Sequence, residues 1–218
     1  GWILKELKQY PQSIQHFRNS IAIDSALFSS YNGLSKVYAA LKQYDSARIY
    51  YQKAMQKFPD KTVTGNYLGN FFKSIHQYDS ALHYYKQAIQ YDSDDPVPYI
   101  NIAKTYTQIK QRDSAIVYYT LAAATPSGAP LAYTELGNLY KELKQLDAAA
   151  IYFKKASDLQ PDFTPAINNL ALIYQEQRKF DSAQHYFRKA IVFDPYNAFL
   201  YNNAGLAFKE TFQVDSAK

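Results

Sequence analysis

Apolar residues recur along this chain at the spacing of amphipathic helices, in pairs of segments joined by short polar turns. Steps of three and four residues place apolar side chains on one face of a helix. In one segment, 130–143, they fall at Tyr133, Leu136, Leu139, Tyr140 and Leu143. In the next segment, 148–159, they fall at Ala149, Tyr152, Phe153 and Ala156. The pattern predicts two helices that pack on each other, with residues 144–146 as the turn between them.

The same pattern returns with a fixed period of 34 residues. Alanine marks it at Ala47, Ala81, Ala115, Ala149, Ala183 and Ala217, with Ser13 in the same phase. An aromatic residue follows four positions later at Phe17, Tyr51, Tyr85, Tyr119, Phe153 and Phe187. Such a period predicts one helix pair copied along the chain, each copy contacting only its neighbours. The repeats are expected at 28–61, 62–95, 96–129, 130–163 and 164–197, with partial repeats 1–27 and 198–218, so we interpret the chain as a segment of a longer protein.

Small and acidic residues fall at set places within the repeat. Gly69, Gly137 and Gly205 are expected where the first helix approaches the second closely. An aspartate precedes each second helix and is expected to cap it: Asp45, Asp79, Asp113, Asp147, Asp181 and Asp215. Prolines are expected to close three of the units, at Pro59, Pro161 and Pro195.

Taken together, these positions resemble the tetratricopeptide repeat. In one unit the resemblance is carried by Tyr133, Leu136-Gly137, Tyr140, Ala149, Phe153, Ala156 and Pro161. One register carries every unit, so the resemblance covers the whole chain. It implies an all-α, right-handed solenoid of antiparallel helix pairs, a single array over 1–218. It also implies that the first helices line a concave groove that holds extended peptides.

Composition removes several classes of function. The formal net charge is +5 and the lysines are spread over every unit, without the dense basic stripe typical of nucleic-acid binding. There is no cysteine, and the four histidines, His16, His76, His83 and His185, are not at the spacing of metal ligands, so no metal site is expected. Glycines occur singly, which gives no phosphate-binding loop and no expected cofactor. No run reaches the roughly 18 apolar residues of a membrane span. None of this selects a cellular compartment.

The Asp-Ser pairs are the one pattern that could suggest catalysis. A nucleophilic serine needs one histidine and one orienting acid beside it. Here Asp-Ser recurs in five units, at the same place before the second helix. Repetition of this kind favours a structural role, so the chain is not expected to be an enzyme.

Amides and lysines on the first helices are the candidate binding residues. The resemblance places them in the groove: Asn66, Asn70, Lys73, Asn101, Lys104, Asn138, Lys141, Asn169 and Asn203. A side-chain amide both donates and accepts, so it can pair with a peptide backbone of any sequence. Lysines beside it favour a peptide that carries carboxylates. The ladder is similar to the asparagine-lined groove of the O-linked N-acetylglucosamine transferase repeats. The alternative is that these residues only keep an exposed face soluble.

Three functions remain open at this point. The first is a non-catalytic scaffold that binds an extended segment of a partner protein. The second is a regulatory or substrate-docking arm of a multidomain enzyme, such as a glycosyltransferase, a sensor kinase or a protease. The third is a self-assembling array whose open repeat ends stack between molecules. A clamp for a chaperone C-terminus is not expected, because Leu131 and Glu135 stand where that clamp needs cations.

Overall fold

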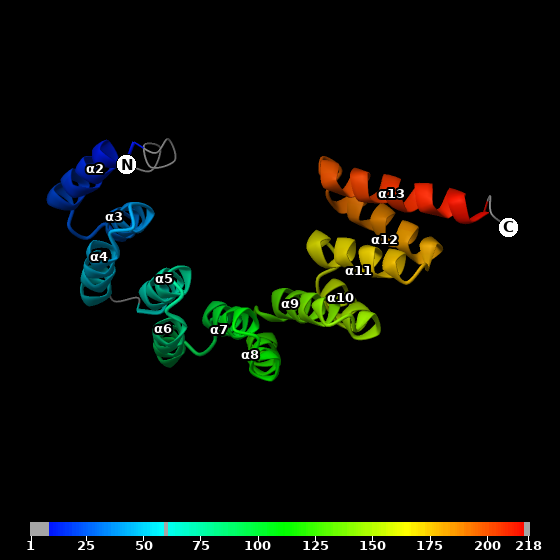
Figure 1. Cartoon of the computed structure of the whole chain (residues 1–218), viewed down its shortest axis with the longest axis horizontal. Coiled ribbons are helices and arrows are strands. Elements are labelled where there is room, and N and C mark those ends of the chain that lie inside the picture. The colour runs from blue at the N-terminus through cyan, green and yellow to red at the C-terminus, as the bar shows by residue number, and fades with distance from the viewer. Residues whose placement is uncertain (1–8, 59–60, 216–218) are drawn as a thin grey trace. The chain divides into compact units, whose positions relative to one another are not determined.

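The chain is helical throughout the part that the structure describes. The computed structural model describes residues 9–58 and 61–215, and the side chains of residue 61 and residues 210–215 lie outside that description. Within these ranges there are twelve helices and no strand (Figure 1). They are α2 (Tyr10–Ile23), α3 (Phe28–Ala40), α4 (Tyr44–Lys57), α5 (Lys61–Ser74), α6 (Tyr78–Tyr91), α7 (Pro96–Gln108), α8 (Arg112–Ala124), α9 (Ala129–Glu142), α10 (Leu146–Leu159), α11 (Thr164–Glu176), α12 (Phe180–Phe193) and α13 (Ala198–Asp215).

The helices belong to two compact units, Gly1–Ile109 and Lys110–Lys218. In the first unit α3 packs on α4 and α5 packs on α6, and α5 also contacts α7. In the second unit α9 packs on α10 and α11 on α12, while α9 contacts α11 and α11 contacts α13. This is the predicted succession of helix pairs, so the all-α repeat fold is confirmed. The division between the units falls inside the repeat expected at 96–129.

The turns within the pairs use a left-handed residue that the sequence pattern did not reveal. Backbone φ is positive at Lys42 (59°), His76 (61°), Lys110 (63°), Lys144 (60°) and Arg178 (60°), which are spaced by the repeat period. A left-handed conformation costs a non-glycine residue about 1–2 kcal/mol. It is common just after the end of a helix, where a cation also interacts favourably with the last carbonyls. The turn is therefore built from a basic residue rather than glycine.

The predicted aspartate caps are wrong. The N-cap residues of α4, α6, α8 and α10 are glutamines and that of α12 is Lys179, and none of these caps has a side-chain hydrogen bond. Each helix begins earlier than expected, so Asp45, Asp79, Asp113, Asp147 and Asp181 lie inside its first turn. There a carboxylate still interacts with the positive end of the helix dipole, without acting as a cap. The side chain of Asp215 lies outside the described residues.

The two expected prolines that lie within the described residues each follow the end of a second helix. α10 ends at Leu159 and α12 at Phe193, two residues before Pro161 and Pro195. Proline cannot continue a helix without losing a hydrogen bond and meeting the preceding turn. Pro59 lies outside the described residues.

Glycines on the first helix make room for an aromatic ring of the second. A Cβ atom at Gly69 would lie 2.4 Å from the ring of Tyr85, and one at Gly137 would lie 2.6 Å from the ring of Phe153. Both rings are fully buried. The expected close approach is therefore confirmed at these two positions. At Gly205 nothing lies within 4 Å of such a Cβ, so no close approach is found there among the described residues.

Stacked aromatic rings join the two helices of a repeat on another face. Tyr38 stacks on Tyr50, Phe72 on Tyr84, Tyr140 on Tyr152 and Tyr174 on Tyr186, with ring centroids 5.2–5.5 Å apart. Offset stacking of this kind adds roughly 0.5–1.5 kcal/mol beyond the apolar area it buries. The stacks recur at the repeat period. In the repeats 62–95 and 130–163 the helix pair is therefore held by two contacts, that of the glycine with the buried ring and that of the stacked rings.

Candidate functional site

Five of the nine predicted binding residues lie on two neighbouring helices of the first unit. Asn66, Asn70 and Lys73 are on α5, and Asn101 and Lys104 are on α7. Residues four and three apart share one face of a helix, and α5 contacts α7. We call these five residues the α5–α7 cluster.

The asparagines of the α5–α7 cluster take part in hydrogen bonds within the protein. Asn101 Nδ2 donates to Asn66 Oδ1 across the two helices at 3.2 Å. Asn70 Oδ1 accepts from the hydroxyl of buried Tyr85 at 2.7 Å. An amide has two N–H donors and an oxygen with two lone pairs, so one bond leaves further capacity. Asn70 is exposed and Asn101 half-buried, whereas Asn66 is buried.

Two cations stand close together beside these amides. Lys73 is half-buried and Lys104 is exposed. Burial lowers the pKa of Lys73 below its ordinary value of 10.5, and the positive charge of Lys104 lowers it further. Both causes disfavour the protonated amine of Lys73. A carboxylate placed between the two lysines would be attracted by both positive charges and would favour the protonated form again. The electrostatics of the cluster suit an acidic group.

The other four predicted residues lie in the second unit. Asn138 and Lys141 are on α9, Asn169 is on α11 and Asn203 is on α13. Asn169 Nδ2 donates to Asn138 Oδ1 at 3.3 Å. Asn203 Nδ2 donates to Asn168 Oδ1 at 3.1 Å. The sequence predicted that these amides share a face, but not that they bond to one another between consecutive first helices.

One buried amide was missed. Asn32 on α3 is 5% exposed, and its Oδ1 has no hydrogen-bond partner. The sequence did carry a sign of it, since Asn32 occupies the same place in its repeat as Asn66 and Asn168. On the same helix as Asn32, Lys36 is half-buried, with its Nζ 5.1 Å from the ring centroid of Tyr67.

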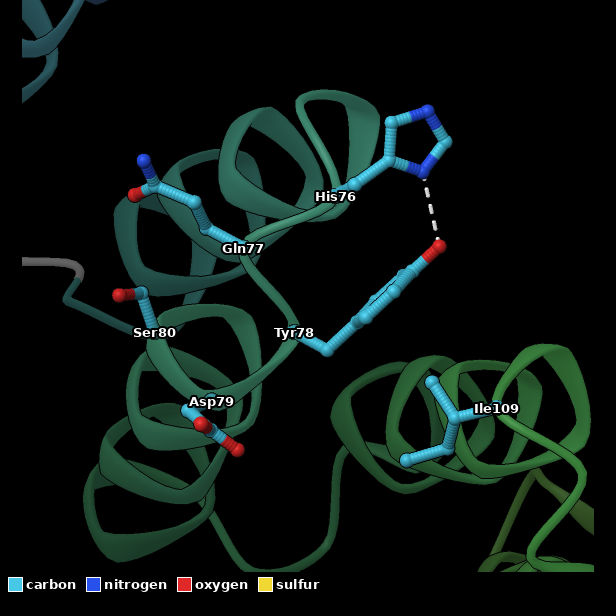
Figure 2. A pocket seen from close by; sticks show the side chains of 6 residues that line it. All are labelled: His76, Gln77, Tyr78, Asp79, Ser80 and Ile109. Carbon is cyan, nitrogen blue, oxygen red and sulfur yellow. Dashed lines mark hydrogen bonds between the residues drawn. The ribbon is translucent and has the colours of Figure 1, made fainter.

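A shallow pocket lies at the turn between α5 and α6 (Figure 2). Its volume is about 360 Å³, and it is lined by His76, Gln77, Tyr78, Asp79, Ser80 and Ile109. His76 Nδ1 and Tyr78 Oη are hydrogen-bonded at 2.8 Å, and Gln108 Nε2 donates to the same hydroxyl at 3.0 Å. Figure 2 shows the side chains of Asp79 and Ser80 pointing away from His76. A nucleophilic serine must meet its histidine, and at this Asp-Ser pair the two side chains diverge.

The described residues lack two further features. They hold no group of three or more His, Cys, Asp or Glu residues that could bind a metal ion. Among the same residues no helix is both long enough and apolar enough to cross a membrane.

Family models decide the classification of the chain. Two models match the chain, and both are described as the tetratricopeptide repeat. One matches residues 98–124 and 131–163, and the other matches residues 28–61 and 165–197. Together they span more than half of the chain. The chain belongs to the tetratricopeptide repeat family. Proteins built from these repeats are generally scaffolds for protein–protein interaction. No curated protein matches the chain.

Solved structures of other tetratricopeptide repeat proteins share the fold. The Cut9–Hcn1 assembly of the APC/C is similar over 94% of this chain, at 17% identity and a TM-score of 0.58, and the match spans 40% of that chain. Yeast Tom70 is similar over 93% of this chain, at 18% identity and a TM-score of 0.75, spanning 43% of that chain. YrrB, described as having an unusual peptide-binding site, is similar over 85% of this chain and 96% of its own, at 17% identity and a TM-score of 0.52. At these identities the likeness shows the fold alone.

Proposed function

We propose that this chain is a non-catalytic scaffold whose first helices bind an extended peptide segment that carries acidic residues. The observation behind the proposal is the α5–α7 cluster, in which two lysines stand beside amides that retain hydrogen-bonding capacity. Folding does not require two neighbouring cations, because their repulsion destabilises the folded chain. A bound carboxylate would offset that repulsion.

The two kinds of side chain have different roles in this proposal. Asn70 and Asn101 pair with the peptide backbone, which offers the same donors and acceptors whatever its sequence. Lys73 and Lys104 select peptides with a carboxylate at this point, because like charges would be repelled there. In the second unit, Asn138, Asn169 and Asn203 with Lys141 repeat the backbone-binding role. A peptide-binding site has been described for YrrB, which has the same fold.

The experiment measures binding of a fluorescein-labelled decapeptide of alternating Gly and Asp by fluorescence anisotropy. Lys73→Gln and Lys104→Gln should each weaken binding by up to about fivefold at low salt, the range of an exposed charge pair. The loss should shrink as salt rises, because ionic screening acts over about 8–10 Å at ordinary ionic strength. The matched control is Lys86→Gln, since Lys86 is an exposed lysine on α6, a second helix. Equal losses in all three variants, or none, would show that the cluster is not the binding site.

A second pair of variants tests the amides. Asn101→Ala combined with Asn169→Ala should weaken binding of the Gly–Asp decapeptide and of a Gly–Ser decapeptide by similar factors, since the amides bind backbone. Lys104→Ala should weaken only the acidic peptide. If the double asparagine variant bound both peptides as well as the wild type, the first helices would not be the peptide-binding face.

A further inference from the structure

Asn32 is the exception in a series of buried or half-buried asparagines at one place in the repeat. Asn66 Oδ1 accepts from Asn101, and Asn168 Oδ1 accepts from Asn203, in both cases from the residue 35 positions later. The residue 35 positions after Asn32 is Tyr67. Asn32 is 5% exposed, and its Oδ1 has no partner. A buried acceptor without a partner is costly, so this oxygen calls for a donor.

Tyr67 contacts two residues of α3 that lie on either side of Asn32 along the helix. Phe28, Asn32 and Lys36 follow one another at four-residue steps on α3, which places them along one stripe of the helix. The ring of Tyr67 is 5.5 Å from the ring of Phe28 and 5.1 Å from Lys36 Nζ, at the two ends of that stripe. Because the ring contacts the residues one turn before and one turn after Asn32, it is placed to cover Asn32. These are ring contacts, which a side chain can leave by rotating without breaking a hydrogen bond.

We propose that Asn32 Oδ1 is a further peptide-binding group, and that Tyr67 is the lid over it. When the ring of Tyr67 rotates aside, a backbone N–H of the bound peptide donates to Asn32 Oδ1. The site on α5 and α7 is thereby extended onto α3, and this inference rests on the function proposed above. Lys36 stands one turn beyond Asn32, so the segment taken here has a free backbone N–H next to an acidic side chain.

The difference between Asn32 and the two bonded asparagines, Asn66 and Asn168, explains why a lid is needed at Asn32. At Asn66 and Asn168 the neighbouring repeat supplies the donor, so those oxygens are occupied in the folded protein. At Asn32 the neighbouring repeat supplies an aromatic ring, which excludes water but donates nothing through its face. The oxygen is thus kept without a partner until a peptide provides one.

The test compares the Gly–Asp decapeptide with a peptide, called the sarcosine–Asp peptide, in which sarcosine replaces glycine and N-methylaspartate replaces aspartate, so that no backbone N–H donor remains within the alternating sequence. Asn32→Leu keeps the size of the side chain and removes the acceptor. It should weaken binding of the Gly–Asp peptide by about five- to tenfold, the contribution of one hydrogen bond. It should leave binding of the sarcosine–Asp peptide unchanged. Equal effects on both peptides, or no effect on either, would overturn the assignment of Asn32.

Tyr67→Ala provides a second variant that keeps Asn32 intact. Removing the lid should tighten binding of the Gly–Asp peptide and not of the sarcosine–Asp peptide; weaker binding of the Gly–Asp peptide would overturn the lid. Lys73→Gln is measured alongside, because it reports on the α5–α7 cluster independently. If Lys73→Gln weakens binding and Asn32→Leu does not, the extension onto α3 is wrong and the proposed function stands. If Lys73→Gln has no effect, the proposed function itself fails.

Discussion

Replacing Gly137 by alanine should destabilise the protein, whereas the same replacement at Gly205 should stabilise it. Both glycines occupy the same place in the repeat and both lie within helices. A Cβ at Gly137 would lie 2.6, 2.7 and 2.9 Å from three ring atoms of Phe153, and that ring is fully buried. A Cβ at Gly205 would have no atom within 4 Å. Both variants replace glycine by alanine within a helix, but only at Gly137 does the added methyl group meet an aromatic ring.

The magnitude follows from two opposing terms. Alanine in a helix is favoured over glycine by about 1 kcal/mol, and both variants gain this. At Gly137 the new methyl group forces the ring of Phe153 or the helix axis to shift, and overpacking of a core costs roughly 1–3 kcal/mol. We therefore expect Gly137→Ala to lower the free energy of unfolding by up to about 2 kcal/mol. Gly205→Ala should raise it by up to about 1 kcal/mol.

Native-state hydrogen exchange is the suitable assay, because repeat arrays do not always unfold in one step. Amides of α9 and α10 should exchange faster in Gly137→Ala, and urea unfolding followed by far-ultraviolet circular dichroism should begin at lower urea. Adding Phe153→Leu should recover part of the loss, since the smaller side chain leaves room for the methyl group. If Gly137→Ala stabilises α9 as much as Gly205→Ala stabilises α13, the reasoning about helix approach is refuted.

Three further variants test the turn and the buried groups. Lys42→Gly should raise the melting temperature by relieving a left-handed lysine, a gain of about 1 kcal/mol; an unchanged melting temperature would contradict this. Lys73→Met should stabilise at pH 7. In the wild type the pKa of Lys73 is lower in the folded chain than in the unfolded chain, so the unfolded chain binds more protons as pH approaches 10.5. The free energy of unfolding of the wild type should therefore rise with pH in that range. Urea titrations of the variant should not show this rise. Tyr85→Phe should cost about 0.5–1.5 kcal/mol at neutral pH by removing the hydrogen bond to Asn70. Burial raises the pKa of Tyr85 above 10.0, so above pH 10 the unfolded chain releases the phenol proton before the folded chain does. The wild type should therefore lose stability above pH 10. The loss should be smaller in Tyr85→Phe, which has no phenol proton at this position.

The repeat fold was predictable because its main determinants lie close together in sequence and recur. Ala149 and Phe153, spaced by four residues, identify the buried face of a second helix, and both are fully buried. Gly137 was placed correctly for the same reason. The aspartate caps failed because helix ends depend on the preceding turn. There Lys144 adopts a left-handed conformation and lets the helix begin one residue before Asp147.

The candidate site was predictable only in part. The period placed Asn66 and Asn101 on one face, but the bond between them depends on the distance between consecutive first helices, which no residue spacing reveals. Asn32 was overlooked because Gly33 and Tyr67 hold the places that asparagine fills elsewhere in the ladder. Its unpartnered oxygen is a property of three-dimensional packing. The lowered pKa of Lys73 likewise depends on how deeply the fold buries it and on the nearness of Lys104.

The stacked rings give this protein an optical marker of its own architecture. Tyr38–Tyr50, Tyr140–Tyr152 and Tyr174–Tyr186 each join the two helices of one repeat face to face. Ring transitions held in such a fixed, chiral pair produce near-ultraviolet circular dichroism, whereas far-ultraviolet dichroism reports the helical backbone. A spectrum that loses the first band and keeps the second would identify a chain whose helices persist while their partners have separated.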